Sequence, residues 1–149
     1  MSQQILELKE KQSVQVHLQF LQDIINRMAN NSSNVKALTG VVYTILVTVL
    51  ITAQKIQQFW WLGLIIAVIG LLLDSYYLAF ERMYRKKYNS FVDSLNKNKL
   101  DEKEIFNLKP KNTQLKYEVF AEMLENINSF SIVPYYFLFI GLSIILRFM

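Results

Sequence analysis

Long runs of apolar residues alternate with amphipathic and polar stretches along this chain. The apolar runs cover residues 37–53, 59–80 and 129–146. At a rise of about 1.5 Å per residue, a helix over 37–53 is about 25 Å long, just enough to cross a hydrocarbon core of about 30 Å. The third run carries Pro134 in its first turns, where membrane helices tolerate proline. The pattern therefore predicts two membrane helices and favours a third.

The polar regions that flank the first two runs also have helical periodicity. Apolar residues recur every three or four positions from Val14 to Met28, and the same spacing continues beyond the second run through Tyr84 and Leu95. We expect the first helix to end in a bend or cap at residues 30–34, "NNSSN". The helix of the second run is expected to leave the bilayer unbroken and to meet the first helix in a small helical domain.

The carboxyl-terminal half continues the helical pattern. A polar loop is expected at residues 96–103 and a break around Pro110, followed by a third amphipathic helix from Leu115 to Ile127. The predicted fold is all-α, an integral membrane protein with a two-helix transmembrane hairpin, a third membrane helix and cytoplasmic amphipathic helices. Its expected parts are the amphipathic helix 1–34, the hairpin 35–80, the cytoplasmic helical region 81–128 and the third membrane helix 129–149.

Composition strengthens the membrane interpretation. Hydrophobic residues make up 52% of the 149 residues, and the mean hydropathy is +0.20, which is too apolar for an ordinary soluble domain of this size. Four glycines and two prolines leave little material for β-turns. The absence of cysteine excludes a disulfide framework and fits a bacterial cytoplasmic or inner-membrane setting. The mixed polar start is unlike a signal peptide, so we expect it to stay on the chain.

Short connections and charge asymmetry predict the topology. Residues 54–58 are so few that the first two membrane helices must form an antiparallel hairpin. The net charge is +4, and the turn holds only Lys55, whereas four basic residues follow the second run. The positive-inside rule then places the amino terminus and residues 81–128 in the cytoplasm, and the carboxyl terminus outside if the third run spans the inner membrane. The expected membrane-interface anchors are Trp60, Trp61, Tyr76, Tyr77, Arg82, Arg85, Lys86 and Lys87.

Asp74 is the only charged residue of the second apolar run. An aspartate near the centre of a membrane helix costs about 2.5–3.5 kcal/mol, and such residues usually face a partner or water. Folding the hairpin about Ile56 brings Lys36 to nearly the depth of Asp74, which makes a Lys36–Asp74 pair the simplest solution. Arg27 is a second candidate, and Arg82 or Arg85 of a neighbouring subunit a third. The pair could either fix the hairpin or belong to a conduction path or switch.

Small residues mark one face of each hairpin helix. They recur every four residues in the first helix and at helical spacing before Asp74 in the second. Such faces let helices approach closely, although they could also line a polar pore. Threonine can return its hydroxyl to the carbonyl four residues back, so this face does not require water. Two such faces on one hairpin lead us to expect a homo-oligomer. The residues are Gly40, Thr44, Thr48 and Thr52, and Gly63, Ala67 and Gly70.

The sequence offers little for catalysis. His17 is the single histidine, so a metal cluster or a Ser/His or Cys/His arrangement is not expected, and its ordinary role is helix packing. Glycine-rich phosphate loops and HExxH motifs are absent. The basic residues 82–87 are typical of a positive-inside anchor, and specific nucleic-acid binding is not expected. We therefore expect no enzyme and no cofactor.

Two segments resemble known membrane proteins. The stretch "HLQFLQDIINRMANNSSNVK", followed by a hairpin and then "LDSYYLAFERMYRKKY", resembles a family of small, mostly uncharacterised bacterial multi-helix membrane proteins over about residues 16–88. The layout is also loosely similar to SLATT-type pore-forming effectors of bacterial antiphage systems. That resemblance implies a protein that responds to a signal from a partner and disrupts the inner membrane.

These observations lead to two expectations for function. The first is a homo-oligomeric inner-membrane protein that forms a pore or perturbs the membrane, in bacterial antiphage defence, with the lipid bilayer and a cytoplasmic defence-system partner as its contacts. The alternative is a non-conducting accessory or scaffold subunit that recruits or regulates a cytoplasmic partner.

Overall fold

The computed structural model describes residues 2–97, 105–109, 115–127 and 129–148. Regular structure within these ranges is entirely helical. Two long helices, α1 (Ser2–Thr52) and α3 (Trp61–Asn96), are joined through the single turn α2 (Ile56–Phe59), and they are followed by α4 (Leu115–Ile127) and α5 (Val133–Leu146). The all-α prediction is confirmed for the described residues.

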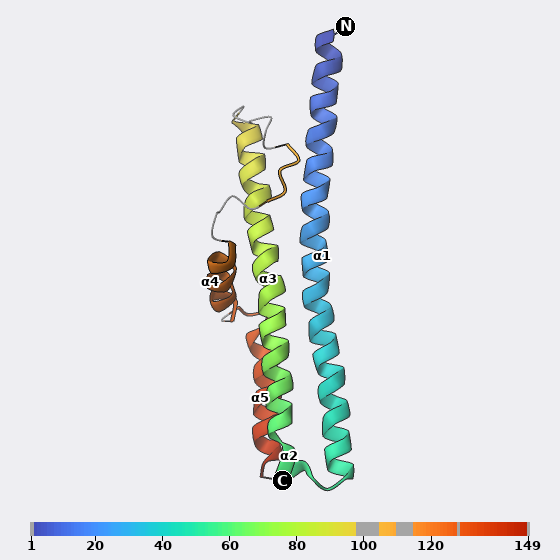
Figure 1. The fold of residues 1–149 in the computed structure, drawn as a ribbon, viewed down its shortest axis with the longest axis vertical. Coiled ribbons are helices and arrows are strands. Elements are labelled where there is room, and N and C mark those ends of the chain that lie inside the picture. Colours follow the sequence, from blue (N-terminus) through green and yellow to red (C-terminus); the bar gives the residue numbers. More distant parts are fainter. Residues whose placement is uncertain (1, 98–104, 110–114, 128, 149) are drawn as a thin grey trace.

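The two long helices form an antiparallel pair that runs the length of the molecule (Figure 1). Both α5 and α4 pack against α3, with α5 beside its first half and α4 farther along toward its carboxyl end. The carboxyl terminus therefore lies at the same end as α2, and the amino terminus lies at the opposite end. This arrangement gives a three-helix end, made of α1, α3 and α5, below a region where α4 packs on α3.

The hairpin turn is closed by backbone hydrogen bonds. Gln54 adopts a left-handed conformation with φ of 54°. Its N–H donates to the carbonyl of Ile51 at 3.0 Å, and the N–H of Lys55 donates to the carbonyl of Leu50 at 2.9 Å. This pair of bonds is the Schellman pattern that satisfies the last carbonyls of a helix. The expected short connection is present, although it covers residues 53–60 and not 54–58, because α3 begins only at Trp61.

The bend expected at residues 30–34 is wrong, because α1 continues through this segment without interruption. The polar residues of "NNSSN" suggested a cap, yet most of them point to solvent, while Ser32 is 6% exposed and faces α3. Helix propensity is a weak preference that packing overrides. Here the contact of Ser32 with α3 holds the segment in the helix, and the boundary at residue 34 marks no structural break.

The expected meeting of the first and second helices beyond the apolar runs is present. His17, Leu21 and Ile25 of α1 are buried, and the His17 ring lies 4.4 Å from the ring of Phe91 in α3. Gln22 donates a hydrogen bond of 3.3 Å to the hydroxyl of Tyr88. The helix of the second apolar run thus continues unbroken to Asn96, as predicted.

The third amphipathic stretch forms the helix α4, which packs against the carboxyl-terminal half of α3. Val119 packs with Ala79 and Met83 in a buried cluster, and Phe80 and Met123 surround it. The loop predicted at residues 96–103 lies almost wholly outside the described residues, as does Pro110. The last helix begins at Val133 and not at residue 129, because residues 129–132 form a turn and Pro134 occupies the first turn of the helix, where its missing N–H costs nothing.

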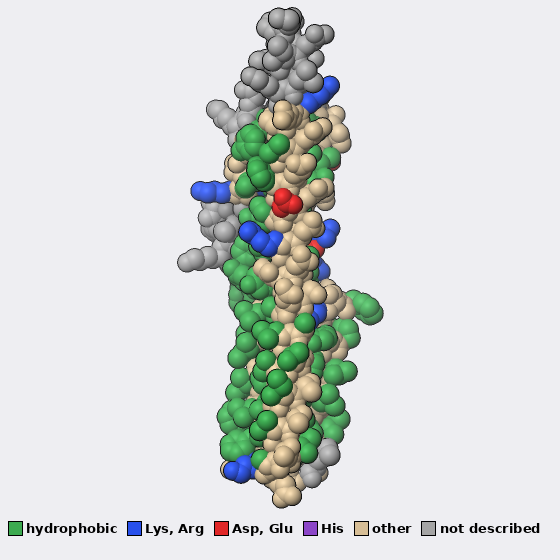
Figure 2. Space-filling view, turned by 90° about the vertical axis from the view of Figure 1, so that its right-hand side faces the viewer, with side chains coloured by type: hydrophobic (Ala, Val, Ile, Leu, Met, Phe, Trp, Pro, Cys, Tyr) green, Lys and Arg blue, Asp and Glu red, His purple; other side chains and the backbone are tan. Residues whose placement is uncertain are grey.

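Two described helical segments, Lys11–Thr52 and Trp61–Asn96, are long and apolar enough to cross a membrane by length and composition. The helix α5 is apolar but shorter. Exposed large apolar side chains concentrate in residues 38–76 and 130–148. Hydrophobic side chains cover the lower half of the face in Figure 2, and most charged side chains lie above them. The molecule therefore has an apolar exterior around its three-helix end.

The helices approach closely along the small face of α3. A Cβ atom added to Gly63 would lie 2.6 Å from the hydroxyl oxygen of Ser143 in α5 and 3.0 Å from the ring of Tyr43 in α1. At Gly70 the added atom would lie 2.8 Å from the methyl carbon of Thr39 and 2.9 Å from the ring of Tyr136. Glycine at these positions lets α1 and α5 both touch the backbone of α3.

We predict that Gly70→Ala lowers the stability of the purified chain in detergent by about 1–3 kcal/mol, because the extra methyl group overpacks a junction of three helices. Gly141→Ala is the matched control, since nothing lies within 4 Å of its added Cβ. Thermal unfolding followed by circular dichroism measures both variants. Equal melting temperatures for the two variants would contradict the close packing at Gly70.

Candidate functional site

Asp74 is completely buried, with 0% of its surface exposed, near the middle of α3. Lys36 Nζ of α1 lies 2.8 Å from its Oδ2, and the lysine side chain is 21% exposed. Among the described residues Oδ2 accepts no hydrogen bond of good geometry, so this contact is an ion pair. The structure thus brings together the two residues that counting around the hairpin placed at equal depth.

Ser32 completes the contacts of the carboxylate. Its hydroxyl donates a hydrogen bond to Asp74 Oδ1, and Lys36 Nζ donates to Ser32 Oγ at 3.2 Å. Ser32 and Lys36 lie one turn apart on the same face of α1, so both side chains meet Asp74 at once. Each carboxylate oxygen therefore has a partner from α1, and the acid is neutralised within one chain.

The helix α5 contributes two tyrosines, Tyr135 and Tyr136, to the same region. Tyr136 is fully buried, and its ring lies beside Gly70 of α3, one helical turn before Asp74. Its hydroxyl group forms no hydrogen bond of good geometry with the described residues. The neighbouring Tyr135 hydroxyl donates to the backbone carbonyl of Lys36. The helix α5 is therefore tied to the turn of α1 that carries Lys36.

A second polar contact joins α1 to α5 nearer the hairpin turn. The hydroxyl oxygens of Tyr43 and Ser143 lie 2.9 Å apart, and Tyr43 also donates to the carbonyl of Phe139 at 3.2 Å. Both side chains are buried beside Gly63. Sequence reasoning missed Ser32, Tyr43, Tyr136 and Ser143. For Tyr43, Tyr136 and Ser143 the available signal was a hydroxyl group in an otherwise apolar run, which needed the position of α5 to be interpreted. Ser32 lies in the polar stretch "NNSSN", where the sequence suggested a cap.

The two small faces have different surroundings. Gly63, Ala67 and Gly70 are buried on the same side of α3 as Asp74, so α1 and α5 cover this face within one chain. One of the two faces behind the expected homo-oligomer is therefore already occupied. On α1, Gly40 contacts the hydroxyl of Tyr135, whereas Thr44 and the threonines that follow it are exposed.

The threonine hydroxyls of α1 are satisfied within their own helix. Thr44 donates to the carbonyl of Gly40 at 2.9 Å, Thr48 donates to that of Thr44 at 2.9 Å, and Thr52 donates to that of Thr48 at 2.8 Å. Because each hydroxyl is bonded to the turn before it, this face can contact lipid or another copy without losing a hydrogen bond.

The other predicted cations lie away from Asp74. Arg27 is exposed on α1. Arg82 donates to the hydroxyl of Ser129 at 3.3 Å, and Arg85 Nε lies 2.8 Å from Glu81 Oε1. Lys86 pairs with Glu122 of α4, and Lys87 donates to the carbonyl of Lys109. Arg82, Lys86 and Lys87 therefore attach later segments of the chain to α3, whereas Arg85 pairs within its own helix.

The expected aromatic anchors lie toward the two ends of the apolar exterior. The guanidinium carbon of Arg147 stacks 5.3 Å from the ring centre of Trp60, which joins the carboxyl terminus to the start of α3. Trp61 is 44% exposed beside it. Tyr76 packs against Tyr77 with ring centres 5.7 Å apart, just beyond Asp74. About 22 Å of helix separates Trp61 from Tyr76 at 1.5 Å per residue.

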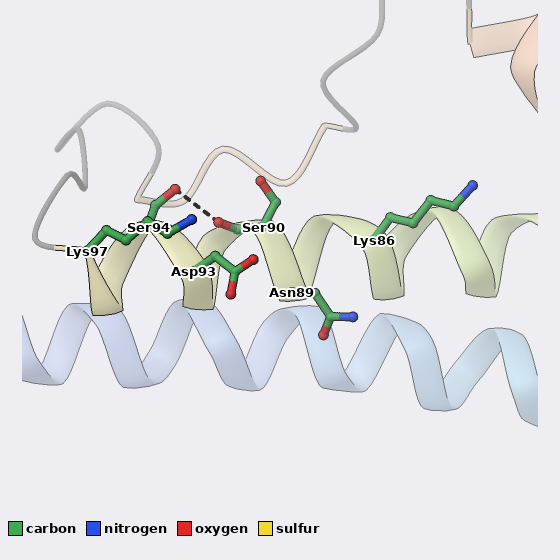
Figure 3. Close-up of a pocket in the computed structure, with 6 residues that line it drawn as sticks. All are labelled: Lys86, Asn89, Ser90, Asp93, Ser94 and Lys97. Atoms are coloured by element: carbon green, nitrogen blue, oxygen red, sulfur yellow. Dashed lines mark hydrogen bonds between the residues drawn. The ribbon is translucent and has the colours of Figure 1, made fainter.

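A buried histidine and an open pocket lie apart from the Asp74 cluster, which consists of Asp74, Lys36 and Ser32. His17 is buried, and its Nδ1 accepts a hydrogen bond of 3.1 Å from the backbone N–H of Phe106, which fits a packing role. An open pocket on α3 has six lining residues spread along one helix, and its single drawn hydrogen bond joins Ser94 to the carbonyl of Ser90 (Figure 3). No group of three possible metal ligands occurs within the described residues. Asp74 and its partners are the more organised site.

Comparisons with known proteins gave no match for this chain among models of protein families, curated proteins or solved structures.

We predict that Lys36→Met destabilises the chain by about 3–5 kcal/mol, because it leaves the Asp74 carboxylate buried without its counter-ion. The double variant Lys36→Met with Asp74→Asn should recover most of this loss, since no charge then remains buried. Denaturant unfolding in detergent, followed by helical circular dichroism, measures each variant. Lys55→Met, at an exposed position of the hairpin turn, serves as the control. Equal losses in the single and double variants would show that Lys36 does not neutralise Asp74.

Proposed function

We propose that this chain is a homo-oligomeric protein of the bacterial inner membrane that forms a pore or otherwise perturbs the bilayer, with the Asp74 cluster holding its resting state. The observation that carries this proposal is the complete burial of the Asp74 carboxylate among apolar helices, where it pairs with the partly exposed Lys36. Ionisable residues inside a membrane bundle are costly, and they commonly mark ion paths or switches.

The distribution of side chains supports insertion into a membrane. Apolar groups are exposed around the three-helix end, whereas Tyr43, Ser143 and the Asp74 carboxylate are buried inside it. Water would favour the opposite arrangement, because large exposed apolar areas are rare on soluble monomers. We propose that α1, α3 and α5 together cross the bilayer, with the amino terminus in the cytoplasm and the α4 region on the cytoplasmic side. The turn α2 and the carboxyl terminus would then face outward at one end.

The proposed mechanism is a separation of α1 from α3. In the closed chain the ammonium and hydroxyl groups of α1 neutralise the Asp74 carboxylate. Moving α1 away would uncover Asp74, Lys36 and the hydroxyl of Tyr136 together, and these groups would need water or the polar groups of other copies. The outward threonine face of α1 offers other copies a close approach. Opening and self-association would therefore support each other.

The cytoplasmic region offers a place for control. The amino-terminal part of α1 packs against the carboxyl-terminal half of α3, where His17 and Leu21 of α1 and Phe91 of α3 are buried. A partner that changed this packing would pull on the same two helices that hold the charged pair. The resemblance to antiphage effectors motivates a defence-system partner and a role in bacterial antiphage defence.

A non-conducting scaffold is the second candidate function. It is favoured because the charged pair and the threonine hydroxyls are neutralised or bonded within a single chain. On this alternative, Asp74 only fixes the hairpin, and the helical region beyond the membrane recruits a cytoplasmic partner.

Induced expression with a membrane-potential dye and a viability count separates the two functions. We predict that the native chain depolarises bacteria. Asp74→Asn should abolish the depolarisation at an unchanged protein level, because the uncovered carboxylate would line the ion path of the open state. Thr48→Leu should abolish it as well, because a larger side chain on the threonine face blocks the close approach of copies. Val49→Leu is the matched control, because Val49 is 58% exposed next to Thr48 and is already apolar. An absence of depolarisation at high expression of the native chain would favour the scaffold.

A further inference from the structure

The outer face of α4 carries apolar side chains that the chain leaves uncovered. Phe120 is 58% exposed and Leu124 is 53% exposed, one helical turn apart. Phe130, in the turn that leads to α5, is 93% exposed. An adjoining side of α4 is occupied, since Val119 and Met123 pack on α3. The helix is therefore apolar both where it meets α3 and on its outer side.

We infer that this outer face of α4, made of Phe120, Leu124 and the adjoining Phe130, lies in the boundary between headgroups and acyl chains of the bilayer. The inference rests on the proposed membrane location, to which it adds a lipid-binding surface outside the three-helix end. The occupant it assigns is phospholipid.

The height of α4 along α3 supports this position. Counted from Trp61 at about 1.5 Å per residue, Ala79 lies about 27 Å along α3 and Met83 about 33 Å. These are the two residues against which Val119 packs. A hydrocarbon core is about 30 Å thick, so a core that begins at Trp61 ends at the level of this contact. The exposed phenylalanines and leucine would thus meet the interface and not bulk water.

The neighbouring side chains change character at the same level. Tyr76 and Phe80 form an aromatic pair, with ring centres 4.8 Å apart, immediately before this contact. Immediately after it, the side chains of Arg85 and Lys86 are 60% and 69% exposed while pairing with Glu81 and Glu122. Aromatic groups followed by hydrated charges are the usual order at a membrane interface. An amphipathic segment at this depth buries its apolar side among the upper acyl chains. The outer face of α4 is thus continuous with the apolar exterior of the hairpin.

The absence of native cysteine allows a direct test with the full chain. We predict that a nitroxide attached at Leu124→Cys, in nanodiscs of a phosphatidylcholine, collides with oxygen several-fold more, relative to a water-soluble nickel chelate, than one at Glu125→Cys. Glu125 is the matched control, because it is exposed on the same helix at a different angle. Phe120→Cys should give the same collision ratio as Leu124→Cys, which would show that the result does not depend on one substitution.

Two further labels set the scale of the measurement. Ile45→Cys, 59% exposed on α1, reports the hydrocarbon region, and the exposed Asn89→Cys on α3 reports water. A collision ratio at Leu124 equal to that at Asn89 overturns the inference while leaving membrane insertion intact. Shielding of Leu124 from both reagents also overturns it, because a protein surface then covers α4. A water-like Ile45 would remove the proposed membrane location and this inference together.

Discussion

Burial of the Asp74 carboxylate is the constraint that the arrangement of the helices depends on. A charge with no exposed surface requires a counter-charge and hydrogen-bond donors at fixed positions, and Lys36 and Ser32 supply them from adjacent turns of α1. This requirement sets the register of α1 against α3, since a shift of one turn would leave the acid without a partner. Tyr135 of α5 then attaches to the same turn of α1 by donating a hydrogen bond to the carbonyl of Lys36.

The small residues of α3 make this geometry possible. At Gly63 and Gly70, side chains of both α1 and α5 approach the backbone of α3 so closely that a methyl group would touch them. The short side chain of Asp74 could not reach Lys36 across a wider gap. The close approach of α1 and α3 therefore allows the Lys36–Asp74 pair to form, and the pair in turn holds the two helices together.

Much of this arrangement could be predicted from the sequence, because helices have a constant rise and the hairpin turn is short. Counting outward from Ile56 placed Lys36 opposite Asp74, and apolar periodicity located the helices. The expected bend at residues 30–34 was wrong because local helix propensity does not include the contact between Ser32 and the buried Asp74. The contacts of Tyr43 with Ser143, and of Tyr136 with the Asp74 region, depend on how α5 packs. No periodicity within one helix contains that information.

The energetics of the pair bear on why a chain would keep it. A buried ion pair rarely adds stability beyond that of well-packed apolar residues, whereas a lone charge at the centre of a membrane costs about 2.5–3.5 kcal/mol. The pair is therefore stable when closed, and opening it toward lipid is penalised twice, once for Asp74 and once for Lys36. Opening toward water, or toward polar groups of other copies, avoids that penalty. On the proposed function, such a pair resists separation in an isolated chain and is released when copies assemble around a shared polar space, which would tie the state of the pair to self-association.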